Sequence, residues 1–198
     1  MNAVVLATRN PGKISELRRI LAPYGVDLVG LDTLPDIGEI AETGATFAEN
    51  ATIKARAVSR ASGMVAVADD SGLTVDALGG MPGVLSARWA GRHGDDAANL
   101  DLVLAQLADV PDPRRRAAFV CAAAAAAPDG REVVVEERLA GSLLRARRGS
   151  NGFGYDPIFV PDGESMTTAQ MSPARKDEIS HRGKAFRALA PLLAGLLE

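Results

Sequence analysis

Two adjacent carboxylates, Asp69 and Asp70, follow a short run of small apolar residues that begins at Met64. The run predicts a buried strand, and Gly72 allows the chain to turn directly after the carboxylates. Two charges at the end of a buried strand are costly unless a cation meets them, and a divalent metal ion held by oxygen ligands is a suitable partner. The pair therefore indicates metal-assisted chemistry, with a solvated polar turn as the alternative.

A second candidate site lies near the N-terminus, where apolar residues 3–7 predict a buried strand and a helix begins close to Ile14. The loop between them presents free backbone N–H groups at a helix N-terminus, which suits phosphate. Lys13 falls in the first helical turn, where the helix dipole disfavours a cation unless an anion is bound. The loop lacks the Walker pattern. Its residues are Thr8, Arg9, Asn10, Pro11, Gly12 and Lys13.

Two further charged residues accompany a helix that we expect from the capping box Thr46–Glu49 to about Ser62. Glu42 precedes this helix beside a turn at Thr43–Gly44 and is a candidate metal ligand. Lys54 lies on the helix one turn after Asn50, where it would neutralise a bound anion or remain a solvent-facing lysine.

A glycine-rich segment over residues 149–157 has the composition of a loop that wraps a flat ligand. Phe153 is placed to stack on a nucleobase, an interaction that contributes roughly 1–3 kcal/mol. The alternative is a glycine-rich turn with Phe153 and Tyr155 in the core. Further along the chain, Lys176, His181 and Arg182 are donors that could read a base edge or an anion, although a lone histidine is usually structural.

The composition limits the class of protein. With 198 residues, 47% of them hydrophobic and 24% charged, the chain can form one globular domain with a sizeable core. A net charge of −3 argues against a broad nucleic-acid-binding surface. Cys121 is the single cysteine, which excludes an internal disulfide. The N-terminal apolar run is too short for a signal peptide or a membrane span, so we expect a cytoplasmic protein.

Other segments complete the expected secondary structure. Alanine-rich residues 119–127 are ambiguous, because alanine favours helix while a following turn and three valines favour a hairpin of two strands, which we prefer. We also expect a strand at 26–31 and a helix through Leu100 and Leu107 that is capped by Asp95 or Asp96. A short helix should start at Ser172–Pro173, and another should cover 182–197 with a potential interruption at Pro191.

Taken together, these segments resemble the inosine triphosphate pyrophosphatase family. The matching stretches occur in the family's order and span nearly the whole chain, and the ordered set is far more specific than any one stretch. Departures are small: Gln170 stands where an acidic residue is expected, and the 119–127 strand is unusually alanine-rich. The matching stretches are residues 8–13, 42–44 with Phe47 and 49–50, 68–73, 80–88, 152–157 and 180–183.

The resemblance implies an α/β fold, elongated and two-lobed, with a long curved mixed central sheet flanked by helices. Residues 1–198 would form one domain with the active-site cleft between its lobes, and the protein would be a homodimer. The implied activity is Mg²⁺-dependent hydrolysis of ITP, dITP and XTP to the monophosphate and pyrophosphate, which cleanses the nucleotide pool. Other possibilities are removal of the terminal phosphate alone, a pyrophosphatase for modified pyrimidine nucleotides and a non-catalytic nucleotide sensor.

The resemblance also implies roles for single residues. Asp70 would be the proton acceptor and would bind Mg²⁺ together with Glu42, and Lys13 and Lys54 would neutralise the triphosphate. Whether Asp69 or Asp70 makes the direct metal contact stays open. The implied substrate contacts are Thr8, Arg9, Asn10, Pro11, Gly12, Lys13, Lys54, Ser71, Phe153, Gly154, Tyr155, Asp156, Lys176, His181 and Arg182.

Overall fold

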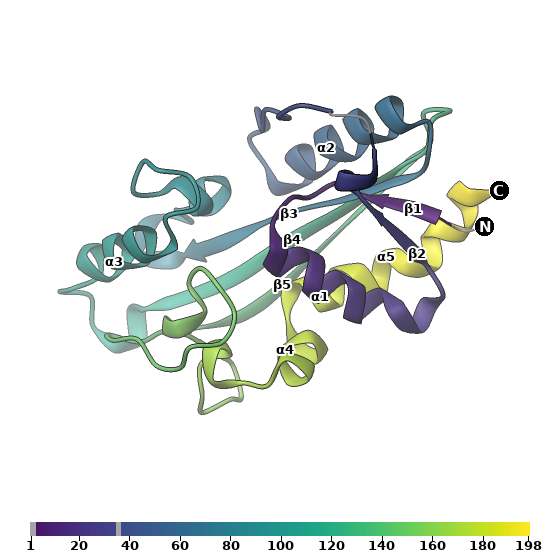
Figure 1. Ribbon diagram of the computed structural model, residues 1–198. Coiled ribbons are helices and arrows are strands. Elements are labelled where there is room, and N and C mark those ends of the chain that lie inside the picture. The colour runs from purple at the N-terminus through teal and green to yellow at the C-terminus, as the bar shows by residue number, and fades with distance from the viewer. Residues whose placement is uncertain (1–2, 35–36) are drawn as a thin grey trace. The chain divides into compact units, whose positions relative to one another are not determined.

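The computed structural model describes residues 3–34 and 37–198 and has an α/β fold built on a six-stranded sheet (Figure 1). The strand order is β2-β1-β3-β4-β5-β6. β1 pairs parallel with both β2 and β3, whereas β5 and β6 are antiparallel, so the sheet is mixed, as expected. The strands are β1 Ala3–Leu6, β2 Asp27–Gly30, β3 Ala66–Val75, β4 Arg116–Ala126, β5 Glu132–Leu143 and β6 Phe159–Pro161.

Four of the helices begin at polar residues whose side chains accept a hydrogen bond from the first turn. These caps are Asn10, Thr46, Asp95 and Ser172, so Asp95 rather than Asp96 caps the third helix. The Glu49 carboxylate of the expected capping box accepts from the Ala45 N–H, one residue before the cap. The helices are α1 Pro11–Leu21, α2 Phe47–Ser62, α3 Asp96–Gln106, α4 Pro173–Ile179 and α5 His181–Leu197.

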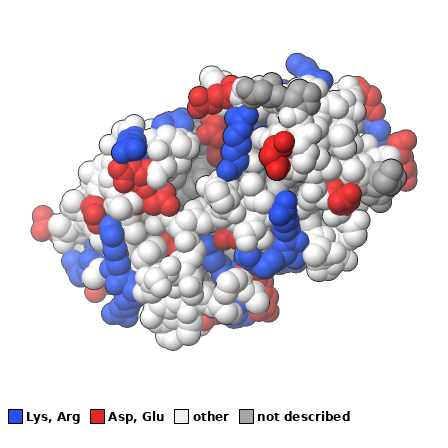
Figure 2. Space-filling view, viewed as in Figure 1, with Lys and Arg blue, Asp and Glu red and all other residues white. Residues whose placement is uncertain are grey.

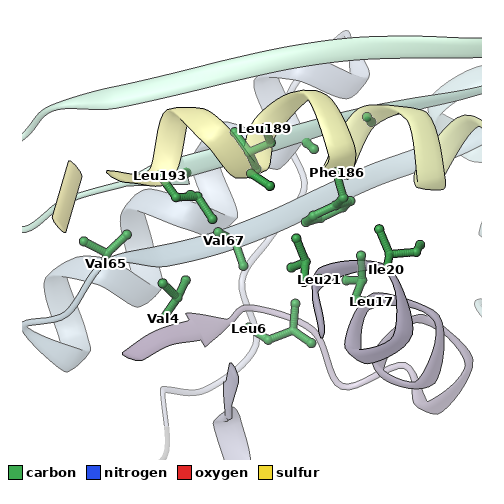
Figure 3. Close-up of a cluster of buried hydrophobic side chains, with 14 of the residues drawn as sticks. Val4, Leu6, Leu17, Ile20, Leu21, Val65, Val67, Phe186, Leu189 and Leu193 are labelled. Carbon is green, nitrogen blue, oxygen red and sulfur yellow. The ribbon is translucent and has the colours of Figure 1, made fainter. Parts of the chain in front are cut away.

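The chain divides into two compact units. Unit 1 comprises Met1–Asp70, Cys121–Glu137 and Arg182–Glu198. Its core packs α1 and α5 against one face of β1, β3 and β4 (Figure 3), with Leu17 from α1 and Phe186 from α5 both fully buried. Val67 of β3 joins this core together with Val65, which directly precedes the strand, so this side of β3 faces α1 and α5.

Unit 2 comprises Ser71–Val120 and Arg138–His181. Its core combines Leu73 and Val75 from β3, apolar residues of α3, and aromatic rings. Phe119 and Phe159 pack with ring centroids 4.5 Å apart. The buried Arg115 guanidinium donates to the backbone carbonyls of Leu107, Leu143 and Leu144.

The expected turn after Asp70 is wrong, because β3 continues through Ser71 and Gly72 to Val75. Leu73 and Val75 are fully buried, and their apolar burial favours an extended chain beyond the carboxylates. Gly72 serves close packing rather than a turn, since a Cβ there would lie 2.3 Å from Ser86 Oγ. The alternative of a solvated polar turn is therefore excluded as well.

The alanine-rich segment forms strand β4, which confirms the hairpin expectation. A turn at 128–130 joins β4 to β5 and is closed by a 2.8 Å hydrogen bond from Ala127 N to Arg131 O. Helix α5 continues through Pro191, so the potential interruption does not occur. Its apolar side chains, including Leu189 and Leu193, are buried against the sheet, which compensates for the hydrogen bond that proline cannot make.

Acidic and basic side chains are interspersed over the face shown in Figure 2. The mixture agrees with the small net charge of −3. Across residues 3–34 and 37–198, none of the helices combines the length and apolar character needed to cross a membrane.

Candidate active site

Asp70 lies at the centre of a buried polar cluster in unit 1. Its Oδ2 atom accepts a 3.1 Å hydrogen bond from Asn50 Nδ2, and Lys54 Nζ lies 3.7 Å from its Oδ1 atom. The same ammonium group contacts Glu42 Oε1 at 2.5 Å. Two carboxylates from different segments therefore share the Lys54 ammonium group. Asn50 and Lys54 can both contact Asp70 because they lie one turn apart on α2.

Asn50 ties this cluster to the segment before α2. Its Oδ1 atom accepts from Gly44 N at 2.8 Å while its Nδ2 atom donates to Asp70. Gly44 approaches so closely that a Cβ would lie 2.6 Å from Glu49 Cβ and 2.8 Å from Asn50 Oδ1. The amide therefore fixes the backbone just after Glu42 relative to the Asp70 carboxylate.

The surroundings of Lys54 and Asp70 shift the pKa values of both side chains. Burial raises the pKa of Asp70, and Glu42 adds to the increase, while Lys54, Lys13 and the Asn50 hydrogen bond oppose it. Burial would lower the pKa of Lys54, but Asp70, Asp69 and Glu42 outweigh it and the pKa is raised. Lys54 thus remains charged, and Asp70 is a stronger base than an exposed aspartate.

The donors present fit a magnesium ion. Glu42 and Asp70 together carry one negative charge more than Lys54 neutralises, and carboxylate oxygens are the ligands that Mg²⁺ prefers. Within the described parts of the chain, no group of three or more acidic, histidine or cysteine side chains could hold a metal. Such a two-carboxylate set is typical of Mg²⁺ sites that are completed by water and substrate phosphates.

Asp69 has a different set of neighbours, also within unit 1. Its Oδ2 atom lies 2.9 Å from Lys13 Nζ and 3.2 Å from both Nε and Nη2 of Arg182. A second carboxylate oxygen, Glu16 Oε2, lies 2.5 Å from Arg182 Nη1. Burial alone would raise the pKa of Asp69, but Lys13 and Arg182 outweigh it and hold the pKa well below its usual range.

The predicted phosphate loop adopts the conformation expected at a helix N-terminus. Asn10 caps α1 by accepting from Lys13 N at 3.2 Å, and Pro11 occupies the first helical position. Thr8 Oγ1 accepts from Asn10 N, and Arg9 Nη1 donates to Gly38 O. Gly12 lies between Pro11 and Lys13 in the first turn.

The glycine-rich loop and Lys176 meet within unit 2. Asp156 is buried and accepts from Phe153 N at 2.9 Å, Thr168 Oγ1 at 2.7 Å and Lys176 Nζ at 2.6 Å. Lys176 Nζ also lies 5.1 Å from the centroid of the Phe153 ring. Glycine at position 152 leaves room for the Asp156 carboxylate, because a Cβ there would lie 2.1 Å from Asp156 Oδ2.

The remaining candidates in unit 2 are held by backbone and aromatic contacts. Gly154 N donates to Asp96 Oδ2 at 2.8 Å. Tyr155 is a core residue whose hydroxyl donates to Ser86 O, so its side chain is committed to packing, and burial raises its pKa. His181 stacks on Phe119 with ring centroids 4.9 Å apart, and Ser71 is a half-buried residue of β3.

A sequence model of the Ham1 family matches residues 4–192. The chain belongs to the Ham1 family. A protein of Streptomyces avermitilis named dITP/XTP pyrophosphatase is 60% identical over 199 residues and is matched over the full length of both chains. A relative with the same name in Mycobacteroides abscessus is 57% identical, with 98% of this chain and 96% of the relative covered.

Solved structures in the Ham1 family agree with this fold. A nucleoside-triphosphatase or dITP/XTP pyrophosphatase from Mycobacterium abscessus, known from a crystal structure, is 57% identical to this chain. The two structures have a TM-score of 0.78, with 96% of this chain and 99% of that one covered. The Staphylococcus aureus Ham1 protein is 40% identical, with a TM-score of 0.85 and 98% of each chain covered. The family resemblance expected from the sequence motifs is thereby confirmed.

The structure adds three residues that sequence reasoning missed: Glu16, Phe119 and Thr168. Glu16 lies three positions after Lys13, on the helix face that also bears Leu17 and Ile20, so its position beside the apolar stripe was a usable signal. Phe119 precedes a run of small residues in β4, and its stacking partner is distant in sequence. Nothing in the local sequence marks Thr168 as a partner of Asp156.

Proposed function

We propose that the chain hydrolyses the bond between the α- and β-phosphates of non-standard purine nucleoside triphosphates, namely ITP, dITP and XTP. The products are the nucleoside monophosphate and pyrophosphate, so the activity removes such nucleotides from the pool. Relatives that match the chain over its full length at 60% identity are named dITP/XTP pyrophosphatases, which supports this substrate class. The observation that carries the proposal is the buried Asp70 carboxylate, raised in pKa and sharing Lys54 with Glu42.

In this proposal, Asp70 orients the attacking water and accepts its proton. The water oxygen bonds to the α-phosphorus, the bond to the bridging oxygen breaks, and pyrophosphate leaves. Asn50 holds the Asp70 carboxylate in place through its amide, and this orientation would persist during the reaction. The raised pKa brings Asp70 closer to the value of an effective general base.

Cationic side chains of unit 1 would neutralise the triphosphate. Lys54 and Lys13 supply the charges, and the N-terminus of α1 presents backbone N–H groups alongside the Thr8 and Asn10 side chains. Ser71, which follows Asp70 in β3, would add a hydroxyl donor. Stabilising charge that develops on phosphate oxygens is the main catalytic contribution expected of such groups.

Magnesium is the proposed cofactor, with Glu42 and Asp70 as its protein ligands. When bound, the ion supplies charge neutralisation to the phosphates and lowers the pKa of water. The two carboxylates would remain oriented by Lys54 and Asn50, respectively.

Residues of unit 2 are proposed to recognise the base. Hypoxanthine and xanthine present O6 as an acceptor and N1–H as a donor, while adenine reverses both. Donation to O6 from Lys176 or His181 would therefore reject adenine by leaving a buried donor unpaired, a mismatch worth up to roughly 10⁴-fold. The Arg182 guanidinium, a third candidate from the sequence, is instead bound to Asp69 and Glu16. Phe153 would stack on the base, and Asp156 would hold Phe153 and Lys176.

We further propose that residues 1–198 act as one functional domain of a cytoplasmic homodimer that binds neither nucleic acid nor membranes. The small negative net charge supports the absence of a nucleic-acid-binding role.

Product analysis tests the proposed function. The purified protein is incubated with ITP and Mg²⁺, and the products are separated by anion-exchange chromatography beside reactions with ATP and modified pyrimidine triphosphates. We expect IMP and pyrophosphate from ITP and little turnover of ATP. Formation of IDP and phosphate would contradict the proposal. Binding of ITP without turnover would identify a sensor, and preference for a pyrimidine would change the substrate class.

A further inference from the structure

We propose that Asp69 is a positioning residue that holds the Lys13 ammonium in place for the triphosphate, and that it is not a ligand of the metal ion. The inference rests on the proposed function, in which Lys13 neutralises substrate phosphates. It assigns different roles to two carboxylates that are adjacent in the chain.

The alternation of side chains along β3 separates the two carboxylates. Val65 and Val67 pack in the core with α1 and α5, so Asp69 falls on that same face of the strand. Its cationic partners come from these two helices: Lys13 from α1 and Arg182 from α5. Asp70 points the other way, toward α2, which lies on the opposite side of the strands in Figure 1.

A chain of ion pairs fixes the Asp69 carboxylate. Glu16 binds Arg182 Nη1, and Arg182 in turn donates from Nε and Nη2 to Asp69 Oδ2. The side chains of Arg182 and Asp69 are 3% and 0% exposed, so the arrangement is shielded from water. The Asp69 carboxylate that contacts Lys13 is therefore fixed by hydrogen bonds from the buried Arg182 guanidinium.

Among these ion-paired residues, Lys13 is the one that belongs to the predicted phosphate loop. It lies in the first turn of α1, where the helix dipole disfavours a cation, and Asp69 Oδ2 at 2.9 Å compensates for this. A lysine side chain has many rotamers, and holding it in one place before the ligand arrives reduces the ordering cost of binding. Asp69 therefore contributes to nucleotide affinity through Lys13.

A double-mutant cycle tests this role without relying on turnover. The Kd of ITP is measured by isothermal titration calorimetry in EDTA for the wild type, Asp69→Asn, Lys13→Met and the double variant. We expect Asp69→Asn to weaken binding by about three- to tenfold. In the Lys13→Met background the same substitution should change the Kd by less than twofold, because the group that it positions is gone. Equal effects in the two backgrounds would overturn the proposal.

Metal binding gives the second readout. Mn²⁺ binding in the absence of nucleotide, followed by electron paramagnetic resonance, should be the same in Asp69→Asn and the wild type and weaker in Asp70→Asn. Weaker Mn²⁺ binding in Asp69→Asn would contradict the assignment. Glu132→Gln, which breaks the exposed pair with Arg56 in the same unit, is the matched acid-to-amide control and should leave both measurements unchanged.

Asp69→Glu serves as the second variant if Asp69→Asn does not fold. It keeps the charge but displaces it by one methylene, so it should weaken ITP binding in the wild type and have less than a twofold effect in Lys13→Met. Equal effects in the two backgrounds would again overturn the role of Asp69. A wild type that releases no pyrophosphate from ITP would refute the proposed function instead, and the cycle remains readable from binding alone.

Discussion

Asp69 and Asp70 are both buried, yet the pKa of one carboxyl is lowered and that of the other is raised. Burial acts against the charge of each. Lys13 and Arg182 overcome it at Asp69, whereas Glu42 adds to it at Asp70, where Lys54 is shared. Asp69 is accordingly a fixed counter-ion, and Asp70 is the carboxylate suited to accept a proton.

Cys121, whose side chain is fully buried beside Asp69, provides a test of how well this interior excludes solvent. Burial raises the pKa of its thiol, and the nearby Asp69 carboxylate, whose Oδ2 lies 4.0 Å from Sγ, adds to the increase. Because a raised pKa keeps the thiol protonated, we expect no reaction of the native protein with Ellman's reagent from pH 7 to pH 9. The unfolded protein in guanidinium should react at an ordinary rate. Rapid labelling of the native protein at pH 8 would contradict this account.

At the residue scale, the types of the site residues could be predicted from the sequence, but their partners could not. Thr8–Lys13 and Glu42 stand in recognisable loop and turn patterns. The pairing of Arg182 with Asp69 joins positions 113 residues apart, and no local pattern encodes it. The same is true of Thr168 and Asp156, which meet because of how the chain folds in unit 2.

At the element scale, β3 is the strand that positions the chemistry. It places Asp69 and Asp70 on opposite faces and continues to Val75, where apolar burial in unit 2 holds it. Gly72 permits the close approach of the segment at residues 83–86: a Cβ there would lie 2.3 Å from Ser86 Oγ and 2.6 Å from Gly83 O. Glycine is therefore required at this position for packing.

Substituting Gly72 by alanine should lower the free energy of unfolding by about 1–3 kcal/mol, because the new methyl group collides with backbone as well as side-chain atoms. Gly195→Ala is the control: it lies in α5 with open space around it, and alanine should stabilise the helix by about 0.5–1 kcal/mol. Urea unfolding of the two variants measures both effects. Equal stability of Gly72→Ala and the wild type would contradict the close packing of Gly72 against Gly83 and Ser86.

Much of the secondary structure follows from periodicity and capping residues. Thr46 and Ser172 correctly predict the starts of α2 and α4, and the apolar stripe of α1 is recognisable in the sequence. The sequence pattern underestimates the length of β3, because two adjacent charged residues usually indicate the end of a buried strand. Burial of those charges depends on Lys13, Lys54 and Arg182, which come from other elements.

At the scale of the whole molecule, the two units carry different parts of the candidate chemistry. Unit 1 contains the buried ion pairs around Asp69 and Asp70, and unit 2 contains the Asp156 cluster with Phe153 and Lys176. Exposed ion pairs, such as Arg116 with Asp162, contribute little to the free energy of unfolding. The chemically relevant charges are the buried ones.

The proposed homodimer predicts a particle of twice the 20.6 kDa chain mass. Sedimentation-velocity ultracentrifugation over a hundredfold range of protein concentration measures this directly. We expect a dimer to dominate at micromolar concentrations, as for a stable symmetric interface. A single species at the monomer mass throughout that range would contradict the dimer and would leave the proposed chemistry of each chain intact.

The most direct test of the central claim separates binding from turnover in Asp70→Asn. The substitution removes the proton acceptor and one proposed metal ligand but preserves the size of the side chain, and an amide can still accept from Asn50. We predict that the rate of pyrophosphate release from ITP with Mg²⁺ falls by at least roughly 10²–10⁴-fold, while the Kd of ITP in EDTA stays within about threefold of the wild-type value. Pyrophosphate release at a near-normal rate by Asp70→Asn would contradict the account.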